Sequence, residues 1–222
     1  MQFVYHQDSG VDILTINDQL HKYIFKVRRH DSSKPLFFRN LIDDILYKYE
    51  VISINKKNTT LKLIESKELK IALSQKLHIG WCKIDFKSIE KVIASLNELG
   101  VDKITFIDCQ YSQKQYKINF DKLHTLLTNS SSQSGRSDII KLEVVESLDK
   151  FLELYPDSYM FNFSSNNITN YIDKIDTIVV GCEGGFSDDE IAKFSPSKIV
   201  GVDNPLILRS ETAVLTVASK LL

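Results

Sequence analysis

Three of the eight glycines in this 222-residue chain lie in one short segment that could bind a small molecule. The glycine segment, Gly181-Cys182-Glu183-Gly184-Gly185-Phe186, follows the apolar run 176–180. Ser187 and Glu190 then have the spacing of a capping box, which predicts a strand, a glycine turn and a helix beginning at Ser187. Glycines at the carboxyl end of a parallel strand allow a ligand to approach main-chain N–H groups closely.

The chemistry of the glycine segment excludes one large class of ligand. It lacks the Lys and Ser/Thr of a phosphate-binding P-loop and the GxGxxG spacing of a dinucleotide turn. Asp188 and Asp189 in the first turn of the predicted helix would repel a phosphate. We therefore do not expect a nucleoside triphosphate. A cradle for another ligand and an ordinary strand-to-helix turn are about equally compatible with the composition.

A second apolar segment, residues 204–213, leads into a predicted helix that reaches the last residue. Pro205 stiffens a turn after a short strand expected at 198–202. The apolar positions 214, 215, 217, 218, 221 and 222 cover most of the helix circumference, which predicts burial on more than one side. Core packing is one explanation. A dimer interface is slightly favoured, because so apolar a terminal helix must be covered.

Two other segments carry polar chemistry. Residues 133–136, Gln-Ser-Gly-Arg, follow three serines and are typical of a Ser-rich linker ending in a surface arginine. Residues 21–39 contain one acidic side chain, Asp31, and six basic ones: Lys22, Lys26, Arg28, Arg29, Lys34 and Arg39. This basic strip is either a solvated face or a site for a phosphate backbone.

The composition, 43% hydrophobic and 26% charged, excludes a disordered, collagen-like or disulfide-scaffold chain. The net charge of -1 gives no hint of a nucleic-acid partner. Residues 1–66, however, carry 10 basic and 8 acidic side chains, whereas residues 67–222 carry 18 and 21. The near-neutral total therefore conceals the basic strip, and binding of RNA would have to be local.

The three cysteines, Cys82, Cys109 and Cys182, are scattered and show neither CxxC nor Cys/His metal spacing. This usage favours a reducing, cytoplasmic environment and argues against a zinc site. Residues 1–8 have no basic region followed by an apolar stretch, and no run approaches the roughly 18 apolar residues of a membrane span. We expect neither export nor a membrane. The histidines and Trp81 are expected to be structural.

The secondary-structure pattern changes along the chain. Residues 3–65 show short β-rich runs with a hairpin connection at 55–58, which predicts a small β-barrel or sandwich. Beyond a Lys, Glu and Ser-rich stretch at 66–77, helices alternate with strands, which predicts a parallel α/β sheet covered on both faces. We place the domain boundary after residue 66. The later elements expected are helices at 89–99 and about 118–127 and strands at 103–108, 139–145, 158–163, 177–180 and 198–202.

Taken together, these segments resemble the RsmE family, the ribosomal RNA uridine N3-methyltransferases of the SPOUT class. The resemblance runs over nearly the whole chain and is carried by residues 21–29, 98–101, 133–136, 181–187 and 206–213. It implies a PUA-like RNA-binding β-barrel over 1–66 and a SPOUT α/β domain over 67–222, with a trefoil knot over about 158–222. It also implies a homodimer. Cys182 stands where the family usually has Pro, and Asn204 where it commonly has Gly.

The resemblance further implies a reaction, the transfer of a methyl group from S-adenosylmethionine (SAM) to N3 of a uridine in 16S ribosomal RNA of the small subunit, without a metal. Arg136 would contact RNA phosphate or stabilise the uridine anion, with Gln133 and Arg209 as further catalytic candidates. The alternatives are a SPOUT methyltransferase with another RNA target and a non-catalytic RNA-binding or ribosome-assembly module.

The resemblance assigns two sets of binding residues. The cofactor would be held by Asn162, Phe163, Ser164, Gly181, Glu183, Gly184, Gly185, Gly201, Leu206, Ile207, Leu208 and Thr212. The RNA backbone would be held by Lys22, Lys26, Arg28, Arg29 and Arg39.

Overall fold

The structure, a computed structural model, describes residues 2–112 and 117–222 and divides into two compact units. Unit 1 comprises the residues up to Ala72 together with Ser131–Ile139, and unit 2 comprises Leu73–Ser130 and Ile140–Leu222. Met1, the first residue of the expected N-terminal domain, lies outside the described residues. The boundary expected after residue 66 falls inside strand β5 (Asn58–Glu68), whose last residues are exposed. The polar residues near position 66 therefore belong to the exposed end of a strand.

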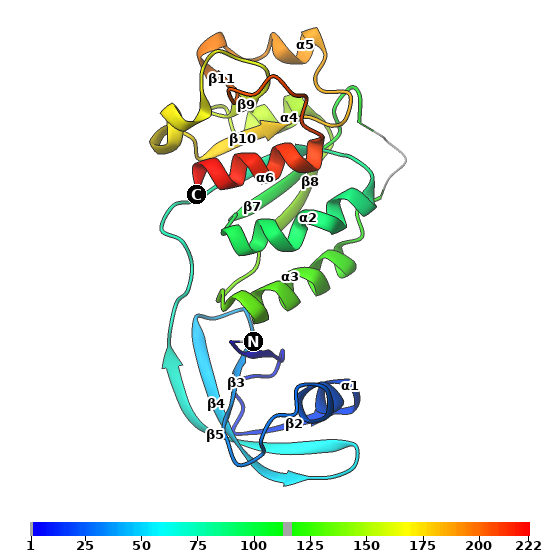
Figure 1. The fold of residues 1–222 in the computed structure, drawn as a ribbon, viewed down its shortest axis with the longest axis vertical. Helices are drawn as coiled ribbons and strands as arrows, with labels where there is room; N and C mark the ends of the chain where they lie inside the picture. Colours follow the sequence, from blue (N-terminus) through cyan, green and yellow to red (C-terminus); the bar gives the residue numbers. More distant parts are fainter. Residues whose placement is uncertain (1, 113–116) are drawn as a thin grey trace. The chain divides into compact units, whose positions relative to one another are not determined.

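Unit 1 is built on a five-stranded sheet with the order β1-β3-β4-β5-β2. Its other strands are β1 (Val4–Tyr5), β2 (Ile13–Asn17), β3 (Leu36–Arg39) and β4 (Ile45–Ile54). The β1–β3 pair is parallel and the other pairs are antiparallel, and β4 and β5 form a long curved ribbon (Figure 1). Phe38 of β3, Tyr49 of β4 and Leu61 of β5 are fully buried in one hydrophobic cluster. The predicted β-rich domain is therefore confirmed as a curled, half-barrel sheet with β1 and β2 at its edges.

Two short helices of unit 1 carry the basic strip, α1 (Asp18–Lys22) and the π-helix η1 (Tyr23–Val27). Lys22, Lys26, Arg28 and Arg29 are exposed. Arg28 Nε donates to the Tyr23 hydroxyl at 2.8 Å, and its guanidinium lies 5.1 Å from the centre of the Tyr23 ring. These cations are therefore accessible to a polyanion.

Arg39 does not belong with these exposed cations, so its expected role in RNA binding is wrong. The side chain is 1% exposed at the end of β3, where Nη2 donates to the Leu69 carbonyl oxygen at 2.7 Å. Its guanidinium also lies 5.5 Å from the centre of the Phe3 ring. Strand alternation does not predict this burial, because Phe38 beside it is buried as well and Phe37 is exposed. The burial comes from contacts with Leu69 and Phe3 that a count of basic residues does not reveal.

Unit 2 contains six parallel strands in the order β11-β9-β10-β6-β7-β8. They are β6 (His78–Cys82), β7 (Lys103–Ile107), β8 (Lys141–Val145), β9 (Tyr159–Phe161), β10 (Thr177–Val180) and β11 (Ile199–Val200). All five residues of β6 are buried, as expected of a central strand covered on both faces. The predicted parallel α/β sheet is confirmed.

The helices of unit 2 follow the strands in alternation. They are α2 (Phe86–Leu99), α3 (Phe120–Ser134, which extends into unit 1), α4 (Leu148–Leu154), α5 (Asp188–Ile191) and α6 (Ser210–Leu221), with short 3-10 helices η2 (Ile168–Lys174) and η3 (Pro196–Lys198). Helix α2 covers the predicted helix at 89–99 and is followed by Gly100, whose left-handed φ of 98° ends it. None of the helices in the described part of the chain is long and apolar enough to span a membrane.

Helices α4 and α6 cover opposite faces of the unit 2 sheet. His78 of β6 packs against Phe151 of α4, with 5.4 Å between ring centres, whereas Trp81 of the same strand hydrogen-bonds Ser210 of α6. Side chains three positions apart on a strand point to opposite faces. Helix α6, which lies beside α2 in Figure 1, buries Val214, Val217, Ala218 and Leu221, while positions 215 and 222 are only half-buried. The trefoil knot over about 158–222 stays a prediction.

The Ser-rich linker expected at 133–136, after three serines, is wrong in its first part, because α3 continues to Ser134. Ser130 and Ser131 are 4% and 0% exposed. The Ser130 hydroxyl donates to the Ala94 carbonyl oxygen at 3.0 Å, and the Ser131 hydroxyl donates to the Asp138 carbonyl oxygen at 2.7 Å. Hydroxyl groups that are hydrogen-bonded can be buried at little cost, so packing overrides the weak helix propensity of serine.

Candidate functional site

A cavity of about 770 Å³ lies in unit 2 at the carboxyl ends of β9 and β10. Its walls are the loop after β9, the glycine segment after β10 and the loop before α6. Parallel α/β sheets bind ligands at this edge, and the volume is that of a small-molecule site. The cavity gathers Asn162, Phe163, Ser164, Gly181, Glu183, Gly184, Gly185, Leu206, Ile207 and Leu208, all of which were predicted to bind the cofactor.

Gly201 and Thr212, the remaining predicted cofactor residues, do not line the cavity. Thr212 is exposed on α6. Gly201 lies behind the wall, where a Cβ atom would stand 2.6 Å from the Asn162 carbonyl oxygen and 3.1 Å from the Ser164 nitrogen. Its N–H donates to the Asn166 carbonyl oxygen at 2.9 Å. Only glycine allows the end of β11 to pack this closely on the loop that forms the cavity wall.

The glycine segment folds as a tight turn between β10 and α5. Gly185 N donates to the Cys182 carbonyl oxygen at 3.0 Å, and Gly185 has a left-handed φ of 70°. The predicted capping box is confirmed: the Ser187 hydroxyl accepts from Glu190 N at 3.3 Å, and Glu190 Oε2 accepts from Ser187 N at 3.0 Å. Burial raises the pKa of the Cys182 thiol, so this side chain stays neutral in the turn.

The charges around the cavity discriminate between ligand classes. The described residues that line it include two acids, Glu183 and Asp203, and neither Lys nor Arg. A phosphate would find no opposite charge there, whereas a cationic sulfonium would. Phe163, Leu206 and Ile207 line the same cavity and are 73%, 70% and 83% exposed, which offers apolar surface to a flat ring. The residues present therefore fit SAM.

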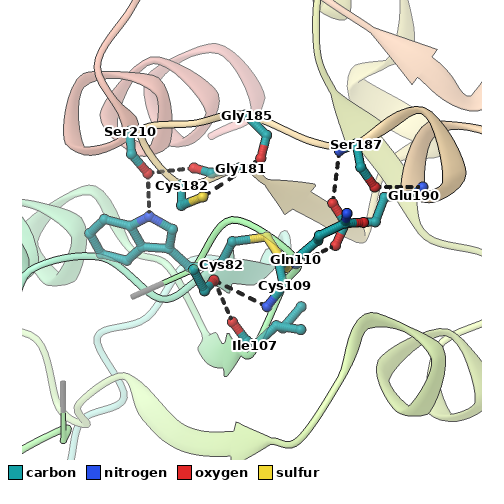
Figure 2. The surroundings of a disulfide bond; sticks show 12 residues. Cys82, Ile107, Cys109, Gln110, Gly181, Cys182, Gly185, Ser187, Glu190 and Ser210 are labelled. Carbon is teal, nitrogen blue, oxygen red and sulfur yellow. Dashed lines mark hydrogen bonds between the residues drawn. A yellow bond between two sulfur atoms is a disulfide. The ribbon is translucent and has the colours of Figure 1, made fainter. Parts of the chain in front are cut away.

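Two residues at or beyond the ends of the neighbouring strands are hydrogen-bonded to the segments around the glycine turn (Figure 2), and neither contact was predicted from the sequence. Trp81 Nε1 donates to the Ser210 hydroxyl at 2.8 Å, which donates to the Gly181 carbonyl oxygen at 2.5 Å. Gln110 N donates to Glu190 Oε1 at 2.8 Å. These contacts could have been predicted from the order of the strands in the sheet, because β6 and β7 end at the same edge as β10.

Cys82 and Cys109 form a disulfide at this edge, and Cys182 is a free, buried thiol (Figure 2). The interpretation of the cysteines as scattered residues did not anticipate the bond. The two positions are 27 residues apart and meet only because β6 and β7 are neighbours in the sheet. Among residues 2–112 and 117–222, no group of three His, Cys, Asp or Glu side chains could hold a metal ion.

Arg136 lies in unit 1, and its expected position on the surface is wrong. The side chain is 8% exposed, and Nε donates to Asp138 Oδ1 at 2.5 Å. The segment is anchored by Ser137, whose hydroxyl donates to Asp44 Oδ1 at 3.0 Å and accepts from Ile71 N at 3.1 Å. The guanidinium of Arg136 is therefore held in a fixed orientation by Asp138.

The other two catalytic candidates are exposed and lie in different units. Gln133 is near the end of α3, in the unit 1 segment Ser131–Ile139 that also holds Arg136. Arg209 stands at the start of α6 in unit 2, directly after Leu208 of the cavity wall. Neither unit by itself brings the three candidates together.

Comparison with known proteins adds independent findings. The RNA methyltransferase domain family matches residues 72–222. Ribosomal RNA small subunit methyltransferase E of Helicobacter pylori is 34% identical over 222 residues, covering 99% of this chain and 98% of its own. A crystal structure of a probable rRNA-methyltransferase from Porphyromonas gingivalis is similar in fold, with a TM-score of 0.83 at 18% identity over 99% of this chain and 96% of its own. Ribosomal RNA small subunit methyltransferase E from Neisseria gonorrhoeae, bound to SAM, has a TM-score of 0.74 at 14% identity over 99% and 95%.

Proposed function

This chain belongs to the ribosomal RNA small subunit methyltransferase E (RsmE) family, and from that premise we propose that it methylates N3 of a uridine in 16S ribosomal RNA with SAM as the methyl donor. The observation that carries the proposal is the cavity in unit 2, which combines glycine backbone, apolar side chains and two acids with no basic side chain among its described lining residues. This chemistry suits a cationic nucleoside and disfavours a nucleotide phosphate.

The sulfonium of SAM supplies an electrophilic methyl group, so the work of the protein is to align the reactants and to help uracil N3 lose its proton. The three loops would hold the donor, and Glu183 and Asp203, which line the same cavity, would supply negative charge to its sulfonium. The guanidinium of Arg136, oriented by Asp138, stabilises the negative charge that develops on the uracil ring.

The exposed cations of the basic strip hold the RNA backbone. Lys22, Lys26, Arg28 and Arg29 lie on or directly after α1 and η1 in unit 1. Contacts of this kind contribute affinity that falls with salt but carry little sequence information. We therefore expect the choice of uridine to depend on unit 2 and on the shape of the RNA.

Replacing Lys26, Arg28 and Arg29 together by alanine is expected to weaken RNA binding and to flatten its salt dependence. Each basic side chain that no longer neutralises a phosphate lowers the slope of log Kd against log salt by about 1. The slope should be measured for the small-subunit RNA over a series of KCl concentrations.

The matched control for the basic strip replaces Lys56, Lys57 and Lys62, which are exposed in the β4–β5 hairpin region of the same unit. This variant removes the same charge and should keep the wild-type slope. Equal slopes for both variants would place the RNA on another surface.

The proposal extends to a homodimer acting in the cytoplasm, where the small ribosomal subunit is assembled. Phe163, Leu206 and Ile207 form an exposed apolar rim on the cavity, and a second copy of the chain would cover it. Sedimentation velocity tests this arrangement, and a monomer at the concentration that supports activity would contradict it.

The decisive test of the function is a map of modified nucleotides in ribosomal RNA from a strain that lacks the gene. We expect one N3-methyluridine to be missing from 16S RNA and to return on complementation with the wild-type gene. A modification lost from another RNA would indicate a different target. Loss of no modification, together with failure to bind SAM, would indicate a non-catalytic assembly module.

A further inference from the structure

The residue before Cys82 and the residue after Cys109 each make a hydrogen bond toward the segments around the glycine turn, and the two cysteines are joined by a disulfide. Trp81, which precedes Cys82, reaches the Gly181 carbonyl oxygen through the Ser210 hydroxyl. Gln110, which follows Cys109, donates its N–H to buried Glu190 at the start of α5. The bond therefore lies between two hydrogen-bonded pathways (Figure 2). One ends at Gly181, at the start of the glycine segment, and the other ends at Glu190 of α5, whose carboxylate also accepts from Ser187 N directly after the segment.

The turn at 109–112 also packs directly on the glycine segment. A Cβ atom on Gly184 would stand 2.9 Å from Tyr111 Cβ, so the two backbones approach closely. The turn is closed internally, because Ser112 N donates to the Cys109 carbonyl oxygen and the Ser112 hydroxyl accepts from Cys109 N, both at 3.1 Å. It therefore moves as one piece, and two links tie it to the end of β6: the disulfide, and the ion pair between Lys83 Nζ and Asp108 Oδ2 at 2.8 Å.

Reduction of the bond would displace this turn rather than the sheet. Strand β6 is hydrogen-bonded to β7 on one side and to β10 on the other, whereas Cys109 lies two residues beyond the end of β7. Two thiol sulfurs cannot remain at bonding distance and must separate to van der Waals contact. Cys82 and Cys109 are 0% and 3% exposed, so neither thiol can swing into solvent. The 109–112 turn must accommodate the separation.

We propose that the Cys82–Cys109 disulfide positions the glycine turn of the cofactor cavity, so that the affinity for SAM falls when the disulfide is reduced. This inference rests on the proposed function, because it takes SAM as the ligand. The reductant is a dithiol: the S–S bond breaks, Cys82 and Cys109 each take up one electron and one proton, and the dithiol is oxidised to its own disulfide. The bond re-forms by exchange with another disulfide, which takes up the two electrons and two protons that Cys82 and Cys109 release and becomes a pair of thiols. In a compartment held reducing, the bond would therefore be formed and broken during function rather than kept permanently.

The test measures the Kd for SAM by calorimetry on the wild-type protein, first untreated and then with excess dithiothreitol. We expect reduction to raise Kd by roughly tenfold, a typical coupling between two sites, and reoxidation to restore it. Thiol titration of the denatured chain should count one thiol before reduction and three after, as the pair and the free Cys182 require. Three thiols in untreated protein, or equal Kd values in both states, would overturn the inference.

Variants separate the pair from the free thiol. Cys82→Ala combined with Cys109→Ala should bind SAM in the same way with and without dithiothreitol, whereas Cys182→Ala should retain the wild-type ratio of the two Kd values. If the Kd of Cys182→Ala no longer changes on reduction, the redox effect belongs to Cys182, and its assignment to the Cys82–Cys109 pair is overturned. If the protein binds SAM in neither redox state, the proposed function itself is contradicted. If it binds SAM with the same Kd in both states, only the redox coupling is contradicted.

Discussion

Arg136→Ala is expected to slow methyl transfer by about a hundredfold or more while leaving the affinity for SAM unchanged. Removing one donor that stabilises a developing anion typically costs a factor of this size in rate. The described residues that line the unit 2 cavity include none of unit 1, to which Arg136 belongs, so its side chain is not part of the described cavity wall. Single-turnover methylation of the small subunit and calorimetry with SAM measure the two quantities separately.

Arg136→Lys is the matched variant for this experiment. It retains the positive charge but loses the planar fork that Asp138 orients through Nε, so we expect activity between those of the wild type and Arg136→Ala. Both variants should melt within a few degrees of the wild type. Wild-type turnover in Arg136→Ala would remove this residue from the mechanism, and a large loss of SAM affinity would assign it to the cofactor site instead.

The glycine turn beside the cavity was well predicted because its signal is local. A strand, a glycine turn and a capping box follow one another within residues 176–190, and the structure reproduces all three. The same holds for Gly100, where a helical periodicity ends in a residue able to adopt a positive φ. In such segments backbone geometry depends on neighbours in sequence, so residue types suffice.

The residues that were placed wrongly depend on contacts distant in sequence. Arg39 and Arg136 are charged and were expected at the surface, yet both are buried. The partner of Arg39 is Leu69, and the segment that holds Arg136 is anchored by the bonds of Ser137 to Asp44 and Ile71, so in both cases the fold supplies the contact. The disulfide has the same origin, since Cys82 and Cys109 meet through the pairing of β6 with β7. Local composition carries no information about such pairings.

The second large effect is expected from Gly201→Ala, which should raise the Kd for SAM between about tenfold and a hundredfold. The new methyl group would stand 2.6 Å from the Asn162 carbonyl oxygen and 3.1 Å from the Ser164 nitrogen, both backbone atoms of the cavity wall. Backbone cannot rotate away as a side-chain end can, and overpacking of this kind costs about 1–3 kcal/mol. Because about 1.4 kcal/mol corresponds to a factor of ten in affinity, displacement of the wall accounts for the expected range.

Gly100→Ala is the control for a general loss of stability. Its methyl group would also be crowded, at 2.4 Å from Leu73 Cδ1, and its φ of +98° disfavours alanine, so this variant should have a lower Tm. Gly100 follows α2 and precedes β7, at the edge of the sheet opposite the cavity, so the folded protein should keep the wild-type Kd. A similar rise in Kd for both variants would mean that SAM binding reports global stability, whereas a rise confined to Gly201→Ala assigns the effect to the packing of β11 behind the Asn162 loop.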